Sequence, residues 1–280
     1  MTQTITPQTI AAFARALADD ERAPGTVAKY RRDAAAFAAW LGARSLDKAA
    51  VTGWKTQLVA QGYAPVTINT MLAALNSLLR FLGRDDLRAR FLRVQRRLFR
   101  DPARSLSLAE YRRLYAAARS RRDQRLALIL ETLCATGIRV SELAAITIEA
   151  AQNGRAEIRL KGKIRLILLP HRLCQKLLRY ARARHLSAGA VFRRASGQPL
   201  SRQQVWRMMK DLAGAAGVAA EKVFPHNLRR LFAITYYSAT HDIVRLADVL
   251  GHSSVETTRL YLLTTSDELH RVLDHLHLVS

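Results

Sequence analysis

The sequence predicts a mainly α-helical protein of two domains, with one small antiparallel β-sheet in the second domain. Three observations lead to this fold class. Apolar residues recur at helical spacing along most of the chain, with capping residues and glycines at the expected helix ends. Only residues 154–170 contain the alternation of a β-strand. The length of 280 residues suits two modest domains, and a hydrophobic content of 49% is ample for their cores.

A near-repeat predicts that the first domain is a bundle of helices. Residues 23–42 and 64–83 both begin with A-P-x-T and end with L-G, which puts proline in a first helical turn and glycine at a helix end. Further helices are predicted near residues 7–18 and 48–61, so a compact four-helix unit is expected. The apolar stripes expected to form its core are Val27, Tyr30, Ala34, Phe37 and Leu41, and Ile68, Met71, Leu72, Leu75, Leu78, Leu79 and Leu82.

An arginine-rich stretch, residues 84–108, connects the two domains in this interpretation. We place the first domain at residues 1–100, a linker at residues 101–106 and the second domain at residues 107–280. A run of charge is commonly a solvated face. Because this one contains few acidic residues that could pair with its arginines, contact with a phosphate backbone explains it better.

The second domain is predicted to contain helices around one β-hairpin. Residues 154–170 form the hairpin, with its turn at K-G-K, residues 161–163. Ser253 and Glu256 have the spacing of a capping box, so a helix is expected to begin just after His252. Helices are predicted near residues 107–119, 123–135, 171–185, 201–216, 226–239, 242–249, 254–263 and 266–277.

The charge balance indicates nucleic acid as the partner. Lysine and arginine number 45 against 22 acidic residues, which gives a net charge of +23 and a pI of about 11.2. Charge of this size repels itself unless a polyanion neutralises it. A GC-rich genome would also favour arginine and alanine codons, but it does not explain the shortage of acids.

The sequence disfavours several other classes of protein. No run approaches the roughly 18 apolar residues of a membrane span. The first residues lack the basic start and apolar core of a secretory leader. Cys134 and Cys174 have neither metal-ligand spacing nor the pattern of a disulfide framework. We therefore expect a soluble cytoplasmic protein without a membrane partner.

Two pairs of residues in the second domain have the chemistry of an anion site. In ATGIRVSEL, Arg139 is expected near a helix start, beside backbone N–H groups that favour phosphate. Glu142 lies one turn later and can orient a cation, although the pair alone is more typical of a surface ion pair. In PHNLRRL, His226 and Arg229 lie three apart on one helical face. They suit an anion that also exchanges a proton, but an isolated pair of this kind is weak evidence.

Two further segments contain residues of the same kind. Lys161 and Lys163 flank Gly162, so one of them could project from the turn into a groove, although a turn lysine is usually only solvated. In LGHSSVETTRLY, His252 lies near the positive end of the predicted helix, where an anion is favoured. In a straight helix the backbone of Tyr261 would lie about 13 Å from that of His252. A target shared with His252 therefore requires a bend in the chain.

The basic chain thus contains a set of two arginines, a lysine, two histidines and a tyrosine. This set resembles the tyrosine recombinase/integrase family, which includes phage integrases and Xer-type recombinases. The resemblance spans nearly the whole chain, including a helical first domain that grips DNA, the core-binding (SAM-like) domain of the family. Its most specific parts are TGIRVSEL, HNLR and LGHSSVETTRLY. The second domain is then expected to be the catalytic domain, acting on DNA at the bacterial nucleoid.

The resemblance also implies a role for each matching residue. The implied active site consists of Tyr261 as the nucleophile, Arg139 and Arg229 as the phosphate clamp, Lys161 as the general acid, His226 in proton transfer, His252 as a hydrogen-bond partner of the phosphate, and Glu142 as a supporting brace. The sequence departs from the family at two places. Arg230 stands where the family often has a second histidine, and the short hairpin turn leaves Lys163 as an alternative to Lys161.

The implied reaction requires neither ATP, a metal nor another cofactor. A tyrosine phenol, with an ordinary pKa of about 10, is a poor nucleophile at neutral pH. Cationic neighbours would favour the phenolate and stabilise the charge that builds on the phosphate oxygens. Attack displaces the 5′-hydroxyl and leaves a 3′-phosphotyrosine, so one phosphate ester is exchanged for another.

Two alternative functions remain open. A type IB topoisomerase shares the tyrosine chemistry but relaxes DNA, and a DNA-binding relative without catalysis would lack the tyrosine or an arginine. The helical first domain and the tail after Tyr261 favour a recombinase of double-stranded DNA with an inverted-repeat core site. Integration, excision, inversion and resolution are all compatible with these residues. The predicted tail helix has an apolar stripe, expected to dock on a neighbouring protomer in a dimer or tetramer: Leu269, Val272, Leu273 and Leu276.

Overall fold

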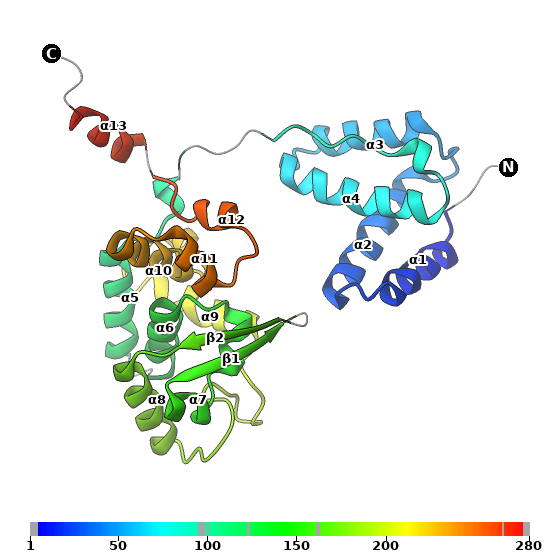
Figure 1. Ribbon diagram of the computed structural model, residues 1–280. Coiled ribbons are helices and arrows are strands. Elements are labelled where there is room, and N and C mark those ends of the chain that lie inside the picture. The colour runs from blue at the N-terminus through cyan, green and yellow to red at the C-terminus, as the bar shows by residue number, and fades with distance from the viewer. Residues whose placement is uncertain are drawn as a thin grey trace. The chain divides into compact units, whose positions relative to one another are not determined.

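A computed structural model of the chain divides into two compact units, residues 1–96 and 97–280. The residues that it describes are 5–94, 99, 101–121, 124–160, 163–264 and 266–276, without the side chains of residues 159, 160, 163, 267 and 272. Both units are built mainly of helices, and the second contains a two-stranded antiparallel sheet (Figure 1). The fold class predicted from the sequence is confirmed.

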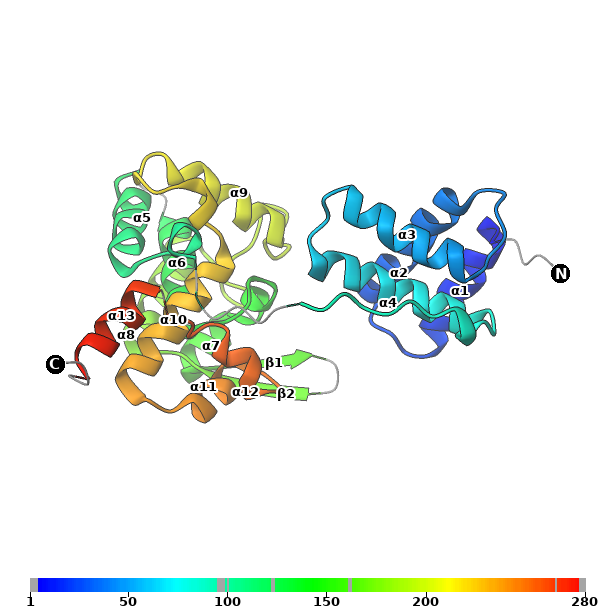
Figure 2. The ribbon, with the colours of Figure 1, turned by 90° about the horizontal axis from the view of Figure 1, so that it is seen from above.

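The first unit is a four-helix bundle. Its helices are α1 (Pro7–Asp19), α2 (Pro24–Leu41), α3 (Lys48–Ala60) and α4 (Pro65–Phe81), followed by a 3₁₀ turn, η1 (Asp85–Leu87). The prolines of the near-repeat occupy first helical positions, as predicted. α2 and α4, the two matching helices, pack against each other (Figure 2). Their apolar stripes form the core of the unit, in which Phe37 and Leu72 are fully buried.

The start of the arginine-rich stretch belongs to this first unit. Residues 88–94 run back along α3 and α4 (Figure 1). The Asn76 side chain accepts a hydrogen bond from the Ala89 N–H (2.8 Å) and donates one to the Ala89 carbonyl (3.0 Å). Asn69 makes the same reciprocal pair with Leu92. An amide side chain can pair with both the N–H and the carbonyl of one extended residue, because it has both a donor and an acceptor.

Among the described residues, the second unit contains nine α-helices, three 3₁₀ turns and the hairpin. The sequence prediction missed one of these helices. In chain order they are η2 (Pro102–Arg104), α5 (Leu108–Ser120), α6 (Gln124–Thr136), η3 (Val140–Ala145), α7 (Ile148–Asn153), β1 (Arg155–Leu160), β2 (Lys163–Leu168), α8 (His171–Ala183), α9 (Arg202–Ala213), η4 (Ala220–Lys222), α10 (Pro225–Thr240), α11 (Ile243–Leu250), α12 (Val255–Arg259) and α13 (Ser266–Asp274). Helix α7 is the missed one. Leu106, at the end of the predicted linker, is buried in the core of this unit.

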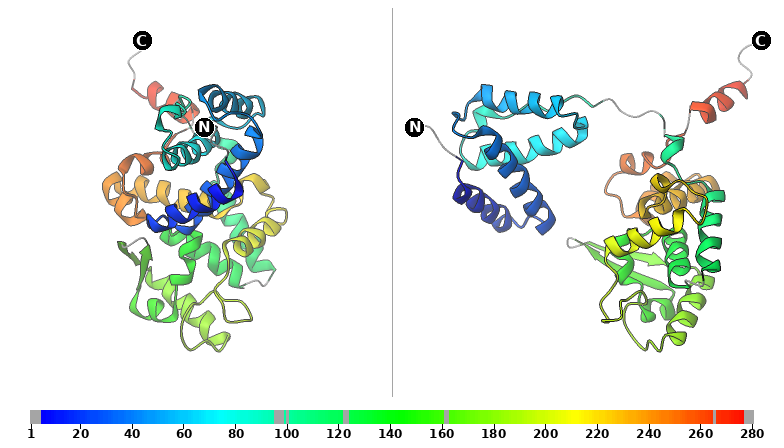
Figure 3. Two further views of the ribbon diagram at one scale, coloured as in Figure 1. Left: turned by 90° about the vertical axis from the view of Figure 1, so that its right-hand side faces the viewer. Right: turned by 180° about the vertical axis from the view of Figure 1, so that it is seen from behind.

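The β-hairpin pairs residue 155 with 168 at its base and Leu160 with Lys163 next to the turn. Figure 3 shows the two strands side by side next to the helices of this unit. One face of the hairpin is buried, where Ala156, Ile158 and Ile167 join the core. The predicted turn residues 161 and 162 lie outside the described residues.

One predicted helix start is wrong. Ser254, not Ser253, is the N-cap residue of α12, and its side chain accepts a hydrogen bond from the Glu256 N–H at 3.2 Å. The predicted capping box with Glu256 is therefore not formed, because the cap lies one residue later. The helix ends at Arg259, so it is also much shorter than predicted. None of the helices in the described ranges is long and apolar enough to cross a membrane.

Candidate active site

Helix α10 supplies the central residue of the site, and it packs against α6, α9 and α11 (Figure 2). Of the seven site residues predicted from the sequence, six lie in the described part of the second unit and come together there. They are Arg139, Glu142, His226, Arg229, His252 and Tyr261. Lys161 lies outside the described residues, and of Lys163 only the backbone is described.

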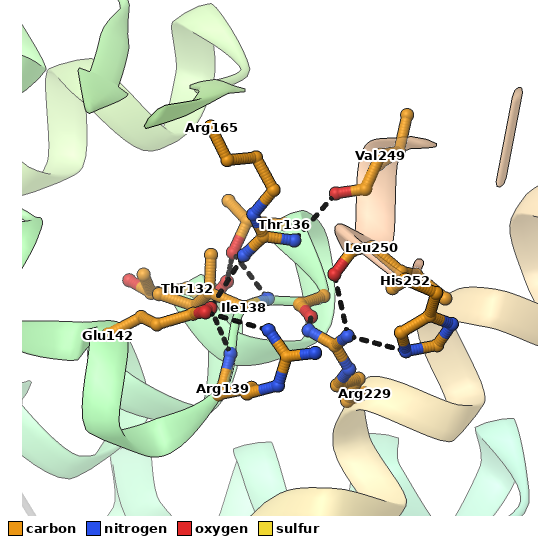
Figure 4. Close-up of polar contacts among 11 residues, drawn as sticks. Thr132, Thr136, Ile138, Arg139, Glu142, Arg165, Arg229, Val249, Leu250 and His252 are labelled. Carbon is orange, nitrogen blue, oxygen red and sulfur yellow. Dashed lines mark hydrogen bonds and ion pairs between the residues drawn. The ribbon is translucent and has the colours of Figure 1, made fainter. Parts of the chain in front are cut away.

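Arg229 is buried to 2% exposure on α10, and the hydrogen-bond partners of its guanidinium within the described ranges are uncharged. Its Nη1 donates to the carbonyl of Gly137 and its Nη2 to the carbonyl of Leu250, both at 2.7 Å (Figure 4). Its Nε has no hydrogen-bond partner among the described residues. Burial, followed by the charge of Arg139, lowers the pKa of Arg229. A buried cation without a counter-ion is costly, so the site favours an anion.

The loop between α6 and η3 is shaped by Gly137. This residue has φ +62°, and a Cβ atom there would lie 2.3 Å from the ring of Phe232. Glycine is therefore favoured here for two reasons: the backbone is left-handed, and α10 approaches too closely for a side chain. The tight turn places the Gly137 carbonyl against Arg229. The glycine of the TGIR segment is thus part of the structure that holds the buried arginine.

Arg139 immediately precedes η3 and forms a short-range pair with Glu142. The Glu142 carboxylate accepts one hydrogen bond from the backbone N–H of Arg139 (2.7 Å) and one from its Nη1 (2.9 Å). The Glu142 side chain is only 5% exposed, whereas that of Arg139 is 38% exposed. The pair is therefore not an ordinary surface ion pair. A buried carboxylate holds a guanidinium whose remaining N–H groups are open to a ligand.

His252 lies next to Arg229 as a neutral imidazole. Its Nε2 is 2.9 Å from Nη2 of Arg229 and its Nδ1 is 2.8 Å from Oγ1 of Thr258. Because arginine can only donate, the network assigns the proton to Nδ1 and makes Nε2 the acceptor. Burial, then the charges of Arg229, Arg139 and Arg165, lower the pKa of His252 to about 4.

Tyr261 reaches the two histidines because the chain turns after α12. The helix ends at Arg259, and the Tyr261 N–H donates to the carbonyl of Thr258 at 2.9 Å. The Tyr261 ring stacks on His252 with centroids 5.4 Å apart and an interplanar angle of 11°. Its centroid is 5.1 Å from that of His226. The bend that the sequence required is present, and Tyr261 is buried to 8% exposure.

His226 forms the open edge of this cluster, in the first turn of α10. Its side chain is exposed on one side. Partial desolvation lowers its pKa, followed by the charges of Arg229, Arg230 and Arg139. His226 is therefore a neutral base or a weakly held proton source near neutral pH, next to the phenol of Tyr261.

Sequence reasoning missed two residues of the site, Arg165 and Thr258. Thr258 is fully buried in α12 and fixes the tautomer of His252. Arg165 on β2 donates from Nη2 to Glu142 Oε2 at 2.6 Å and from Nη1 to the Val249 carbonyl at 2.9 Å (Figure 4). An arginine between apolar residues of a strand is unusual, but the sequence does not indicate which acceptors Arg165 would reach.

Models of two protein families match this chain. The model of the phage integrase family matches residues 104–268, and that of the phage integrase N-terminal SAM-like domain matches residues 4–86. Tyrosine recombinase XerD of Vibrio cholerae is 30% identical over 95% of this chain and 92% of its own length. Tyrosine recombinase XerA of Pyrococcus furiosus is 30% identical over 80% of this chain and 78% of its own.

Solved structures share the fold. A lambda integrase dimer bound to a COC′ core site has a TM-score of 0.73 and 18% identity, covering 91% of this chain and 94% of that one. The Tn1549 transposon integrase in complex with transposon right end DNA has a TM-score of 0.71 and 17% identity, covering 97% and 99%. The fold and the tyrosine, arginine and histidine cluster define a class of DNA strand-transfer enzymes. The chain belongs to the phage integrase family, the tyrosine recombinases.

Proposed function

We propose that this tyrosine recombinase performs site-specific DNA recombination with Tyr261 as the nucleophile and Arg139 and Arg229 as the clamp of the scissile phosphate. The observation that carries the proposal is the buried Arg229 guanidinium, which has no carboxylate within ion-pair distance among the described residues and lies near the Tyr261 phenol. A phosphodiester would supply the missing negative charge next to the nucleophile.

The proposed chemistry is a transesterification at phosphorus. The Tyr261 oxygen forms a bond to the phosphorus as its proton leaves, and the bond to the 5′-oxygen of the next nucleotide breaks. The product is a 3′-phosphotyrosine and a free 5′-hydroxyl, and a 5′-hydroxyl of another strand reverses the step. Arg139 and Arg229 stabilise the negative charge that develops on the non-bridging oxygens. The positive charge that the reaction requires therefore comes from side chains.

The two histidines receive different roles. His226, partly exposed beside the Tyr261 ring, would accept the phenol proton, since the lowered pKa keeps its imidazole neutral. His252 would donate a hydrogen bond to the phosphate. For this its proton must move from Nδ1 to Nε2, and a phosphate that takes over the Arg229 donor group would free Nε2 to carry it.

Lys161 is the proposed general acid for the departing 5′-oxygen. The strands on either side of the turn end at Leu160 and begin at Lys163, and the family resemblance aligns the earlier lysine with the acid. A lysine ammonium is a compact proton donor on a flexible stem, which suits delivery from a hairpin turn. The alternative, Lys163, stays open to experiment.

Double-stranded DNA with an inverted-repeat core site is the proposed substrate, and the net charge of +23 suits this polyanion. The lambda integrase was seen as a dimer on a core site and as a tetramer on a Holliday junction. An inverted repeat matches two-fold related protomers. We therefore propose a dimer that pairs into a tetramer on DNA, in the bacterial nucleoid.

The recombination function is tested on DNA sites selected by binding from a random-sequence duplex library. Plasmids carrying two selected sites should yield recombinant products in EDTA without nucleotide, because arginine side chains stabilise the phosphate charge. Relaxation of a supercoiled plasmid without recombinants would favour the topoisomerase alternative. A strict requirement of cleavage for magnesium would contradict the mechanism.

The tail helix α13 is the proposed contact between protomers. Leu269 and Leu273 are exposed on it, at 38% and 53%, and Leu276, just after its end, is 51% exposed. We expect Leu269→Ser with Leu273→Ser to leave the binding of one protomer to a half-site intact but to abolish the cooperative filling of the second half-site. Gel-shift titration on full and half sites measures both. Unchanged cooperativity would place the contact elsewhere.

A further inference from the structure

Arg165 occupies an unusual place in the β-hairpin. The alternation of β2 turns three of its apolar residues outward, with Ile164 at 65%, Leu166 at 47% and Leu168 at 75% exposure. Arg165 lies between them on the opposite face, and its side chain is only 14% exposed. Burying an arginine while leaving aliphatic residues in water is unfavourable for the strand alone. The contacts of Arg165 must offset this cost.

These contacts join three separate segments through one guanidinium. Nη2 donates to Glu142 Oε2, and Nη1 donates to the Val249 carbonyl at the end of α11 (Figure 4). The stem of Arg165 lies against Gly251, where a Cβ atom would be 2.5 Å from Arg165 Cδ. Glycine at 251, with φ +65°, therefore leaves room for the arginine as well as ending the helix.

Each segment leads directly to a group proposed to touch the phosphate. Glu142 uses the same Oε2 to accept the backbone N–H of Arg139, and its Oε1 accepts the Arg139 side chain. The residue after Val249 is Leu250, whose carbonyl holds Arg229. Displacement of Arg165 would therefore free the Glu142 carboxylate to rotate and would loosen the end of α11.

We propose that Arg165 is a positioning residue of the recombination reaction, which fixes Arg139 through Glu142 and the Arg229–His252 pair through the Val249 carbonyl. The inference rests on the proposed function of the same site. The planar fork of an arginine is needed because two acceptors in different segments must be reached at once. Arg165 also ties β2, the strand that leaves the hairpin turn, to the phosphate clamp.

The proposal predicts that Arg165→Met slows the formation of the covalent protein–DNA complex about 100-fold, since a small misplacement of groups that contact the reacting phosphate has an effect of this order. Affinity for the DNA site should stay within a few-fold of wild type. Single-turnover trapping on a nicked suicide substrate measures the rate, and gel shift measures the affinity. Arg155→Met, at an exposed position on the neighbouring strand, is the matched control and should cleave like wild type.

A second substrate separates positioning from a general structural role. In a methylphosphonate, a methyl group replaces one non-bridging oxygen and removes the negative charge that the arginines stabilise. The ratio of wild-type to Arg165→Met cleavage rates should therefore shrink from about 100 to a few-fold on this substrate. A loss of equal size on both substrates would show that Arg165 only maintains the fold, and it would overturn the proposal.

Arg165→Lys provides the test if the methionine variant does not fold. It keeps the charge and the stem but cannot reach both acceptors, so we expect slower cleavage of the phosphodiester and a smaller loss on the methylphosphonate. Wild-type rates for this variant would overturn the proposal. If wild-type protein forms no covalent complex through Tyr261, the proposed function itself fails. Normal trapping at Tyr261 with full activity of Arg165→Met overturns only the inference.

Discussion

Tyr261→Phe is expected to abolish DNA cleavage while leaving affinity for the DNA site within a few-fold of wild type. The substitution removes only the hydroxyl, which is the nucleophile. The ring, buried to 8% exposure and stacked on His252, keeps its packing. The basic surface that provides most of the affinity is also unchanged. A suicide substrate nicked near the scissile phosphate should trap a covalent complex with wild type, and no complex with this variant.

The matched controls are Tyr236→Phe and Tyr237→Phe. Both tyrosines lie on α10, are partly buried and pack against the small apolar cluster that contains Tyr261. We expect both variants to form the covalent complex at rates close to wild type. Trapping by Tyr261→Phe would assign the nucleophile to another residue, and loss of trapping in one of the control variants would identify it.

The sequence alone predicted the parts of this protein that depend on local signals. The first unit follows from the A-P-x-T and L-G repeat, because proline and glycine act at helix ends whatever surrounds them. The buried faces of α2 and α4 follow from their apolar stripes, such as Phe37 and Leu72. The hairpin was predicted from its alternation at residues 154–170.

The end of the chain around Tyr261 shows where local signals fail. Ser253 and Ser254 are both good capping residues, and the spacing to Glu256 favoured the wrong one. The length of α12 was overestimated because residues 260–263 contain no residue that typically ends a helix. The turn follows from tertiary contacts, in which Tyr261 packs between His252 and His226.

Arg165 could not be found by pattern because the strand inverts the usual rule. In a half-buried strand the apolar positions are expected to face the core, which would have turned Ile164 and Leu166 inward and Arg165 toward water. In the structure Ile164 and Leu166 face water, whereas Arg165 shares the buried face with Ile167. On that face Arg165 donates to Glu142, a residue 23 positions earlier in the chain. An interaction at this separation leaves no periodic signal.

The protonation states of the two histidines also could not be predicted from the sequence. The residue types alone suggested a cluster of positive charge with two histidines. In the folded protein burial, followed by the charges of the neighbouring arginines, lowers the pKa of both histidines, that of His252 to about 4. Neutral imidazoles can accept protons or share hydrogen bonds with a phosphate, whereas the fixed positive charge is supplied by Arg139 and Arg229.

Lys161→Ala is expected to slow cleavage of ordinary DNA by about 100- to 10,000-fold, the range typical of a lost general acid. The 5′-oxygen is a poor leaving group unless it is protonated as the bond to phosphorus breaks. A 5′-bridging phosphorothiolate replaces this oxygen with sulfur, which leaves readily without a proton. This substrate should therefore restore most of the lost rate to Lys161→Ala, measured by single-turnover trapping beside the ordinary substrate.

Two further variants make the assignment specific to one residue. Arg139→Ala should stay slow on the phosphorothiolate, because its loss lies in the stabilisation of charge on the non-bridging oxygens and not in the leaving group. Lys163→Ala should cleave ordinary DNA faster than Lys161→Ala and gain little from sulfur. If the sulfur rescue belongs to Lys163→Ala, the general acid lies two residues later, at the start of β2. If neither lysine variant is rescued, the acid lies outside the hairpin, and His226, next to the Tyr261 ring, becomes the residue to test.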